Sequence, residues 1–133
     1  MELLELYQLA EQEDIEVSGF RLPKKGMSFM DSDGSCAIAL DHHRMNGQLE
    51  ELLVLCHELG HCMTGSFYTI SSPESWRRRC EADTKAWIIN YLLPEEKIIK
   101  ACREGNTEPW QLAEYFGLPQ QLIEVAVDYY GLT

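Results

Sequence analysis

The sequence lacks a long hydrophobic run, because no apolar stretch approaches the roughly 20 residues that a membrane-spanning helix needs. Its first residues, MELLELYQLAEQEDIE, carry acids where a signal peptide carries a basic segment. We therefore expect a cytoplasmic protein without a membrane partner. Hydrophobic residues fill 45% and charged residues 25% of the 133 positions, which is an ordinary globular balance and suits a single domain over residues 1–133.

Positive charge is scarce as well. Eleven Lys and Arg stand against 22 Asp and Glu, which gives a net charge of −11. Such a surface repels phosphate backbones, whereas nucleic-acid binders usually have a basic face, so we expect no direct contact with nucleic acid. The basic clusters are Lys24-Lys25 and Arg77-Arg78-Arg79. We interpret them as solvated surface, with contact to an acidic partner as the alternative.

Cysteine pairs of the CxxC type are missing, which excludes a zinc ribbon and a thioredoxin-type motif. The five cysteines are Cys36, Cys56, Cys62, Cys80 and Cys102. In a chain without an export signal we expect reduced thiols, most of them buried as small apolar side chains.

Repeats and low-complexity segments are also absent, and the hydrophobic pattern indicates an α+β fold. Two strands, Gly26 to Asp31 and Cys36 to Asp41, flank the turn sequence Asp31-Ser32-Asp33-Gly34, which predicts a small antiparallel sheet. Periodicity, capping residues and breakers predict a helical majority, with helices over 2–14, 48–64, 73–92, 94–103, 107–116 and 119–130.

The most informative segment is His57-Glu58-Leu59-Gly60-His61, an HExxH motif inside the helix predicted over 48–64. Residues four apart lie on one helix face, so both imidazoles can bind one ion at about 2.0–2.1 Å. Glu58 can then take a proton from a metal-bound water. Gly60 permits close approach of another backbone. A chance occurrence is the alternative, and the amphipathic helix and a downstream ligand argue against it.

The third ligand is expected from the next helix, which offers Cys80, Glu81 and Asp83. We choose Glu81, because Ala82 and Ala86 would give this helix a small-residue surface for packing against the motif helix. A carboxylate beside two histidines leaves the fourth position open to water, as a catalytic zinc site needs. Cys80 would instead close the site and make it structural, and a plain surface acid is the other interpretation of Glu81.

The HELGH sequence, the later Glu81-Ala82-Asp83 and the helix end at Leu92-Leu93-Pro94 resemble the ImmA/IrrE family of metallopeptidases. The resemblance covers roughly residues 26–130. It implies a gluzincin-like, zincin-like α+β core in a cytoplasmic bacterial protein, often one encoded by a phage or mobile element. By position, it implies one zinc ion per chain on His57, His61 and Glu81, with Glu58 as the catalytic general base.

Members of this family typically relieve repression by cleaving a helix-turn-helix repressor of the Xre type. The resemblance therefore implies a zinc-dependent endopeptidase with a protein substrate. A non-catalytic anti-repressor and a toxin or immunity component that binds a regulator are the alternatives. Two departures, Arg79 for a frequent glutamate and Lys85 for the aspartate of thermolysin-like enzymes, leave the groups that orient the ligands unassigned.

Substrate contacts are less well defined by the sequence. A strand such as Cys36 to Asp41 could hold an extended peptide by edge pairing. An additional group should stabilise the oxyanion, and the sequence does not discriminate among the candidates Tyr68, Tyr91, His42 and His43.

Residues 107–131 have the spacing of a helix-turn-helix, with Ala113 in the first helix, Gly117 at the turn and Ile123 afterwards. Residues 104–133 contain five acids and no Lys or Arg, so donors for phosphate contacts are missing. We therefore expect helix-turn-helix-like helices with a structural role.

Overall fold

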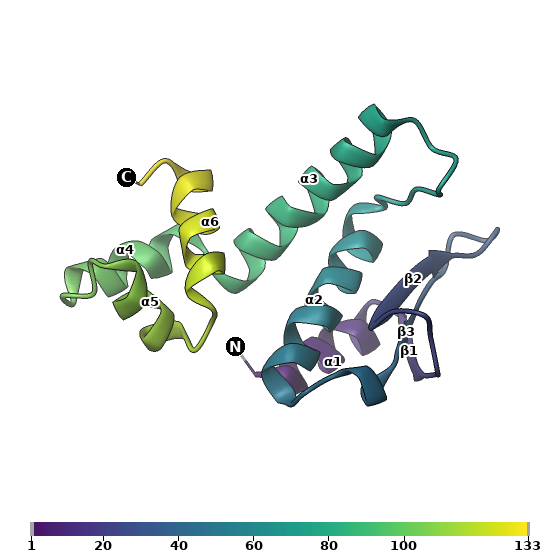
Figure 1. The fold of residues 1–133 in the computed structure, drawn as a ribbon, viewed down its shortest axis with the longest axis horizontal. Coiled ribbons are helices and arrows are strands. Elements are labelled where there is room, and N and C mark those ends of the chain that lie inside the picture. The colour runs from purple at the N-terminus through teal and green to yellow at the C-terminus, as the bar shows by residue number, and fades with distance from the viewer. Residues whose placement is uncertain (1, 133) are drawn as a thin grey trace. The chain divides into compact units, whose positions relative to one another are not determined.

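The computed structural model describes residues 2–132, which form a small sheet and a helical majority and so confirm the predicted α+β class (Figure 1). The helices and strands, in chain order, are α1 (Leu3–Gln12), β1 (Glu16–Gly19), β2 (Gly26–Met30), β3 (Cys36–Leu40), the 3-10 helix η1 (His42–Arg44), α2 (Gln48–Thr64), α3 (Glu74–Leu92), α4 (Glu95–Arg103), α5 (Pro109–Phe116) and α6 (Gln120–Tyr130). Within residues 2–132, no helix combines the length and the apolar character needed to cross a membrane.

Strands β2 and β3 form the predicted hairpin and pair antiparallel along their full lengths. In the turn between them the amide of Asp31 donates to the carbonyl of Ser35 at 2.8 Å. Gly34 has φ +88°, a left-handed conformation that glycine adopts without steric cost. Both predicted strands and the turn sequence 31–34 are thus confirmed.

The sheet as a whole is mixed, because β1 pairs with the other side of β3 in parallel and gives the order β1-β3-β2. The prediction of an antiparallel sheet is therefore wrong for this third strand. The strand is short, and its sequence EVSG has one apolar side chain and no alternation that would indicate a partner. Since β3 is central it has no free edge, so the expectation that it pairs with a peptide is also wrong; β2 has an outer edge.

Most helix ends follow the sequence signals. Gly65 after α2 and Gly131 after α6 have φ values of +67° and +68°, as expected of glycines that end helices. The beginning of α5 differs, because its N-cap is Glu108 and not Thr107. The side-chain oxygen of Gln111 accepts the amide of Glu108 at 3.0 Å, and this bond fixes the first turn.

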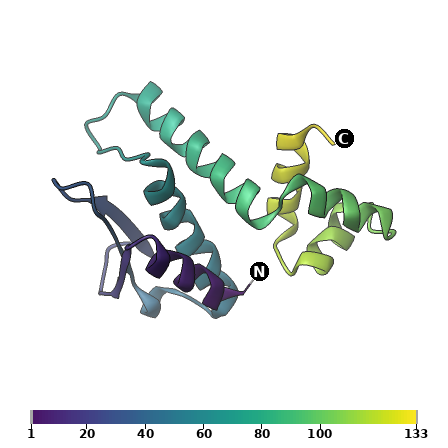
Figure 2. The ribbon, with the colours of Figure 1, turned by 180° about the vertical axis from the view of Figure 1, so that it is seen from behind.

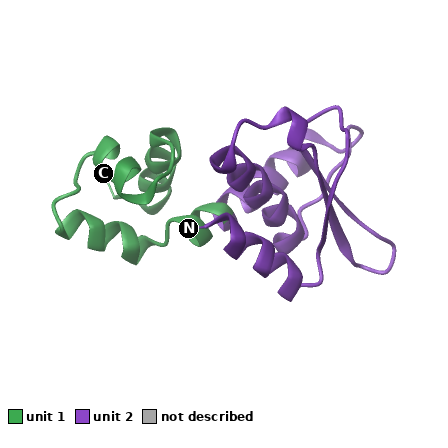
Figure 3. Cartoon of the chain, turned by 90° about the horizontal axis from the view of Figure 1, so that it is seen from below, with its two compact units in different colours: residues 1, 88–133 green, residues 2–87 purple. Residues whose placement is uncertain are grey.

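The described chain divides into two compact units, Glu2–Trp87 and 88–132, which we call the N-terminal unit and the C-terminal unit (Figure 3). The boundary falls inside α3. This division does not test whether residues 1–133 fold as a single domain, which stays a prediction.

In the N-terminal unit, α2 packs against β2 and β3, and α1 packs against α2 (Figure 2). The Tyr7 hydroxyl of α1 donates to the Glu51 carboxylate of α2 at 2.5 Å. The fully buried side chains of this core include Leu6, Ile38, Leu40, Leu55 and Leu59. Because Leu55 and Leu59 hold one face of α2 in the core, His57 lies on a different face, where it is half-buried.

The C-terminal unit consists of the end of α3 and of α4, α5 and α6. Its buried side chains include Ile98, Ala101, Leu112, Ile123 and Ala126. The Tyr130 hydroxyl donates to the Leu93 carbonyl at 2.8 Å and so connects α6 to the end of α3. Residues 117–119 join α5 to α6. The helix pair exists where it was predicted, and its likeness to a helix-turn-helix stays a prediction.

The cysteine expectation is confirmed in part. Cys56 and Cys80 are buried free thiols, and Cys102 is a free, half-buried one. Cys36 and Cys62 form a disulfide that joins the beginning of β3 to α2, so the expectation of reduced thiols is wrong for this pair. Their Cα atoms lie 5.9 Å apart, a normal bridging distance. That proximity comes from helix packing on the sheet and has no signature in the spacing of the two cysteines.

Candidate metal centre

The two motif histidines converge as their spacing on α2 predicts. The Nε2 atoms of His57 and His61 lie 3.2 Å apart. Two ligands at about 2.0–2.1 Å from one tetrahedral ion are separated by about 3.3–3.4 Å. The pair thus has the separation required for binding one ion through both Nε2 atoms.

Glu81 of α3 completes the cluster. Its Oε1 lies 3.6 Å from Nε2 of His61, and its Oε2 lies 4.0 Å from Nε2 of His57. Each of the three residues offers a ligand atom within 4.8 Å of the others. The carboxylate distances are somewhat longer than a tetrahedral edge. The Glu81 side chain is 43% exposed, and its Oε1 also accepts the Tyr68 hydroxyl. The donor set fits a divalent ion such as Zn²⁺, Mn²⁺ or Fe²⁺.

The other two possible ligands on α3 are not in the cluster. Cys80 is 1% exposed, and its thiol faces the carbonyl of Phe67, with 3.7 Å between sulfur and oxygen. Asp83 is exposed. Among the described residues, Glu81 is therefore the candidate ligand that α3 brings to the histidines.

Close packing of α2 and α3 depends on Gly60, as predicted. A Cβ atom at Gly60 would lie 2.9 Å from Cγ2 of Thr84 and 3.4 Å from the Thr84 carbonyl oxygen. The prediction of a small-residue surface is wrong for Ala82, which is exposed. Thr84 is the buried residue at the contact. Residues three apart share a helix face, so Thr84 lies beside Glu81 and faces α2.

His61 is oriented by groups that the sequence analysis did not identify. Its Nδ1 donates to the Ser66 carbonyl at 2.6 Å, and Oγ1 of Thr84 lies 3.2 Å from the same nitrogen. A proton on Nδ1 leaves the lone pair of Nε2 available to an ion. Gly65 turns the chain so that Ser66 folds back onto the helix end. No sequence pattern indicates that the Ser66 carbonyl would contact His61. Gly65, which ends α2, is the only local signal that the chain turns back at this point.

Tyr68 is the oxyanion candidate that the fold brings to the cluster. Its hydroxyl donates to Oε1 of Glu81 at 2.5 Å, and this bond raises the pKa of the phenol. His42 and His43 line a different cavity beside Gly19, and Nε2 of His42 lies 3.3 Å from Oε2 of Glu51. Tyr91 belongs to the C-terminal unit.

Glu58 lies beside the cluster and is 8% exposed. It lines a cavity of about 220 Å³ together with His57, His61 and Glu81, and Met27 and Ser28 of β2 form another part of the wall. This places the predicted general base, the three expected ligands and an edge strand around one space.

Gly26 holds β2 against this part of α2. A Cβ atom at Gly26 would lie 2.8 Å from Cγ1 of Val54 and 3.2 Å from Cγ of Glu58. The missing side chain thus lets the strand approach the helix at Glu58. In the sequence, Gly26 marks the beginning of a predicted strand, and no local pattern indicates this contact.

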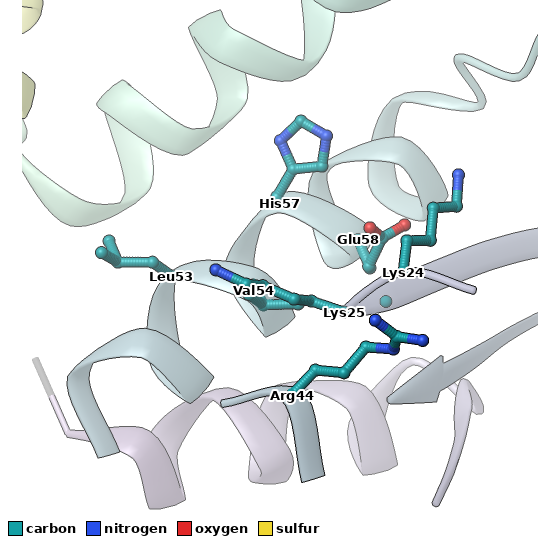
Figure 4. A pocket seen from close by; sticks show the side chains of 8 residues that line it. Lys24, Lys25, Arg44, Leu53, Val54, His57 and Glu58 are labelled. Carbon is teal, nitrogen blue, oxygen red and sulfur yellow. The ribbon is translucent and has the colours of Figure 1, made fainter. Parts of the chain in front are cut away.

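A larger cavity of about 730 Å³ also has Glu58 in its wall (Figure 4). His57 and Glu58 belong to its wall, together with Leu53 and Val54 from the preceding turn of α2. Glu58, the predicted general base, therefore lines two cavities, one at the candidate ligands and one along α2.

Comparisons with protein-family models, with curated proteins and with solved structures found no match to this chain.

Proposed function

We propose that this chain is a zinc-dependent endopeptidase of the kind that its ImmA/IrrE-like motifs imply, and that it cleaves a helix-turn-helix repressor. The observation that carries the proposal is the convergence of His57, His61 and Glu81 beside the buried Glu58. Two histidines and a carboxylate leave one coordination position open, which is the arrangement of catalytic rather than structural zinc sites.

Each group of the site has a distinct role in peptide hydrolysis. Zinc, when bound, would polarise the scissile carbonyl and lower the pKa of water at the site. Glu58 accepts the proton of the attacking water and passes it to the amine as the C–N bond breaks. The Ser66 carbonyl keeps the proton of His61 on Nδ1. Tyr68, whose hydroxyl already points to Glu81, is our choice for the donor to the oxyanion.

We further propose that the peptide binds in extended form along β2. This strand has an outer edge, and its residues Met27 and Ser28 line the cavity of the metal ligands. Backbone hydrogen bonds to such an edge hold a peptide without regard to most of its side chains. The choice of a repressor as the protein substrate is based on the family resemblance.

Metal content, measured by mass spectrometry on untagged protein, is the first test. We expect about one zinc per chain in the wild type and its loss in His57→Ala and Glu81→Ala. Asp83→Ala is the matched control, because Asp83 is an exposed carboxylate on the same helix and should leave the zinc content unchanged. Zinc retained in Glu81→Ala would remove Glu81 from the ligand set.

Glu58→Ala then separates the enzyme from a non-catalytic anti-repressor. We expect this variant to bind zinc and to lose cleavage of an Xre-type helix-turn-helix repressor by about 10²–10⁴-fold. Relief of repression that survives in Glu58→Ala without cleavage would favour an anti-repressor that acts by binding alone. A toxin or immunity component would instead affect cell growth without changing repressor length.

A further inference from the structure

Positive charge in this acidic chain is concentrated beside the proposed active site. The chain has 11 Lys and Arg and a net charge of −11. Three of these cations line the large cavity beside His57 and Glu58, namely Lys24, Lys25 and Arg44. Three more line another cavity, in which Glu81 is part of the wall, namely Arg77, Arg78 and Lys85. Both basic clusters predicted to be plain surface therefore contribute to cavities at the site.

The cavity beside Glu58 combines a cationic rim with an apolar wall (Figure 4). Leu53 and Val54 form the wall on α2, one turn before His57 and Glu58. The cations come from the segment that leads into β2 and from the end of η1. The cavity thus adjoins both the general base and the strand proposed to hold the peptide.

Only part of this positive charge is neutralised by the protein itself. Lys25 forms an ion pair with Glu50. Arg44 forms an ion pair with Asp41, with 3.2 Å between Nε and Oδ2, and its Nε also donates to the Leu22 carbonyl.

Lys24 has no ion pair with any residue from 2 to 132. It is exposed, and it lines both the large cavity and the cavity of the metal ligands. Figure 4 shows its side chain beside that of Glu58. The positive charge available to a ligand therefore lies at the junction of the two cavities.

We propose that this cavity selects a peptide with an aspartate or glutamate close to the scissile bond, and that Lys24 is the residue that selects it. The ammonium of Lys24 binds the carboxylate, and Leu53 and Val54 contact the aliphatic part of the side chain. The inference rests on the proposed function, which it extends by naming a substrate class. The apolar wall favours a carboxylate side chain, whose aliphatic part can pack against it, over the phosphates of a nucleic acid.

Binding, measured apart from cleavage, tests the inference. The protein is Glu58→Ala, with and without added zinc, and the probes are three fluorescein-labelled eight-residue peptides that differ only in two central residues. The two central residues are glutamates in the first peptide, glutamines in the second and lysines in the third. By fluorescence anisotropy we expect the glutamate peptide to bind about tenfold more tightly than the glutamine peptide at low ionic strength. Salt should narrow this ratio, because it screens an exposed charge.

Variants at position 24 assign the preference to Lys24. Each variant is made in the Glu58→Ala protein. Lys24→Gln should reduce the preference for the glutamate peptide over the glutamine peptide to within about twofold, and Lys24→Arg should retain it. Lys24→Glu should instead make the protein prefer the lysine peptide. Lys97→Gln, on α4, is the matched control because it removes the same charge from an exposed residue outside the cavity. Far-UV circular dichroism verifies that each variant is folded.

Several results would overturn the inference. These are the absence of binding by all three peptides, equal binding of the glutamate and glutamine peptides, or a preference that persists in Lys24→Glu. Displacement of the glutamate peptide by an equimolar single-stranded oligonucleotide would assign the cavity to phosphates instead. Selective binding by a wild type that cleaves none of the peptides would count against the peptidase and leave the acidic subsite in place.

Discussion

At the scale of single residues, the hydrogen bonds of His61 determine how well the site is prepared for a metal ion. The Ser66 carbonyl and Thr84 Oγ1 both face Nδ1, so Nε2 is directed at His57 and Glu81 before any ion arrives. Such orienting partners typically contribute tenfold or more to metal affinity. Because the carbonyl belongs to the backbone, Thr84 is the partner that mutation can remove.

We expect Thr84→Val to weaken zinc binding by up to about tenfold, since valine keeps the shape of threonine but loses the oxygen near Nδ1. Competition with a chromogenic chelator measures the affinity. Thr107→Val, an exposed threonine before α5, is the control and should bind zinc as the wild type does. Unchanged affinity in Thr84→Val would leave the Ser66 carbonyl as the sole orienting group.

Asp41 provides a residue-scale test of stability away from the metal ligands. It is 2% exposed, and its carboxylate accepts the amides of Leu22 at 2.9 Å and of His43 at 3.1 Å. The pKa of Asp41 is held below its usual range mainly by the hydrogen bond from the Leu22 amide. The hydrogen bond from the His43 amide and the positive charge of Arg44 lower this pKa further. A carboxyl with a lowered pKa stabilises the fold when ionised, and this contribution is lost as the pH falls through the folded-state pKa.

We therefore expect Asp41→Asn to lower the urea midpoint at pH 7, with the difference from wild type shrinking below about pH 4. Urea unfolding of both proteins at pH 7, 5, 4 and 3 measures the difference between their midpoints. Asp128→Asn removes an exposed carboxylate on α6 and should have little effect at any of these values. A difference that stayed constant down to pH 3 would assign the effect of Asp41→Asn to shape and not to charge.

At the scale of the elements, the site depends on two close approaches made by glycines. Gly60 brings α3 and its Glu81 to the histidines, and Gly26 brings β2 to Glu58. At both positions an added methyl would meet the side chain of a buried or half-buried β-branched residue, Thr84 or Val54. The close spacing of α2 with α3 and of α2 with β2 thus depends on the lack of a side chain at Gly60 and at Gly26.

Gly26→Ala should lower the free energy of unfolding by about 1–3 kcal/mol, because the new Cβ cannot fit without moving β2 or α2. The proposed cleavage activity should fall as well, since Glu58 is one of the groups displaced. Gly19→Ala is a close control: Gly19 is also in a strand, and its added Cβ would have its nearest neighbour at 3.7 Å. Urea unfolding of both variants measures the effect, and equal losses would refute the packing argument.

The elements that were predicted correctly are those whose signals are local. The HExxH spacing, the turn 31–34 and the glycine after α2 each involve a few consecutive residues. The parallel pairing of β1, the Cys36–Cys62 disulfide and the Ser66 contact join segments through packing, and no short pattern encodes them. Glu81 lies between these cases, because its helix was predictable but its approach depends on Thr84 and Gly60.

At the scale of the whole molecule, the cluster lies within the N-terminal unit, between α2 and the first turns of α3. An ion held by both helices would cross-link them. Binding to the folded state alone stabilises it by about 2.7 kcal/mol when the free ion is at a hundredfold excess over its Kd. The stabilisation should be regional, since the described residues 88–132 contribute no ligand to the cluster.

We expect zinc to raise the melting temperature of the wild type but not of Glu81→Ala, and to slow amide hydrogen exchange mainly within residues 2–87. Calorimetry and exchange mass spectrometry measure the two effects. The Asp83→Ala variant should respond to zinc as the wild type does. Equal protection of residues 88–132 would show that the two units are energetically coupled.

The outer edge of β2 has a consequence for the protein in concentrated solution. An edge available to a peptide is equally available to the β2 of a second molecule, and its Phe29 and Met30 are exposed. Antiparallel pairing would bring the lysines before one strand next to the aspartates after the other, so opposite charges would meet. Self-association through this edge would block the proposed peptide site, and the proposed activity per molecule would then fall as the protein concentration rises.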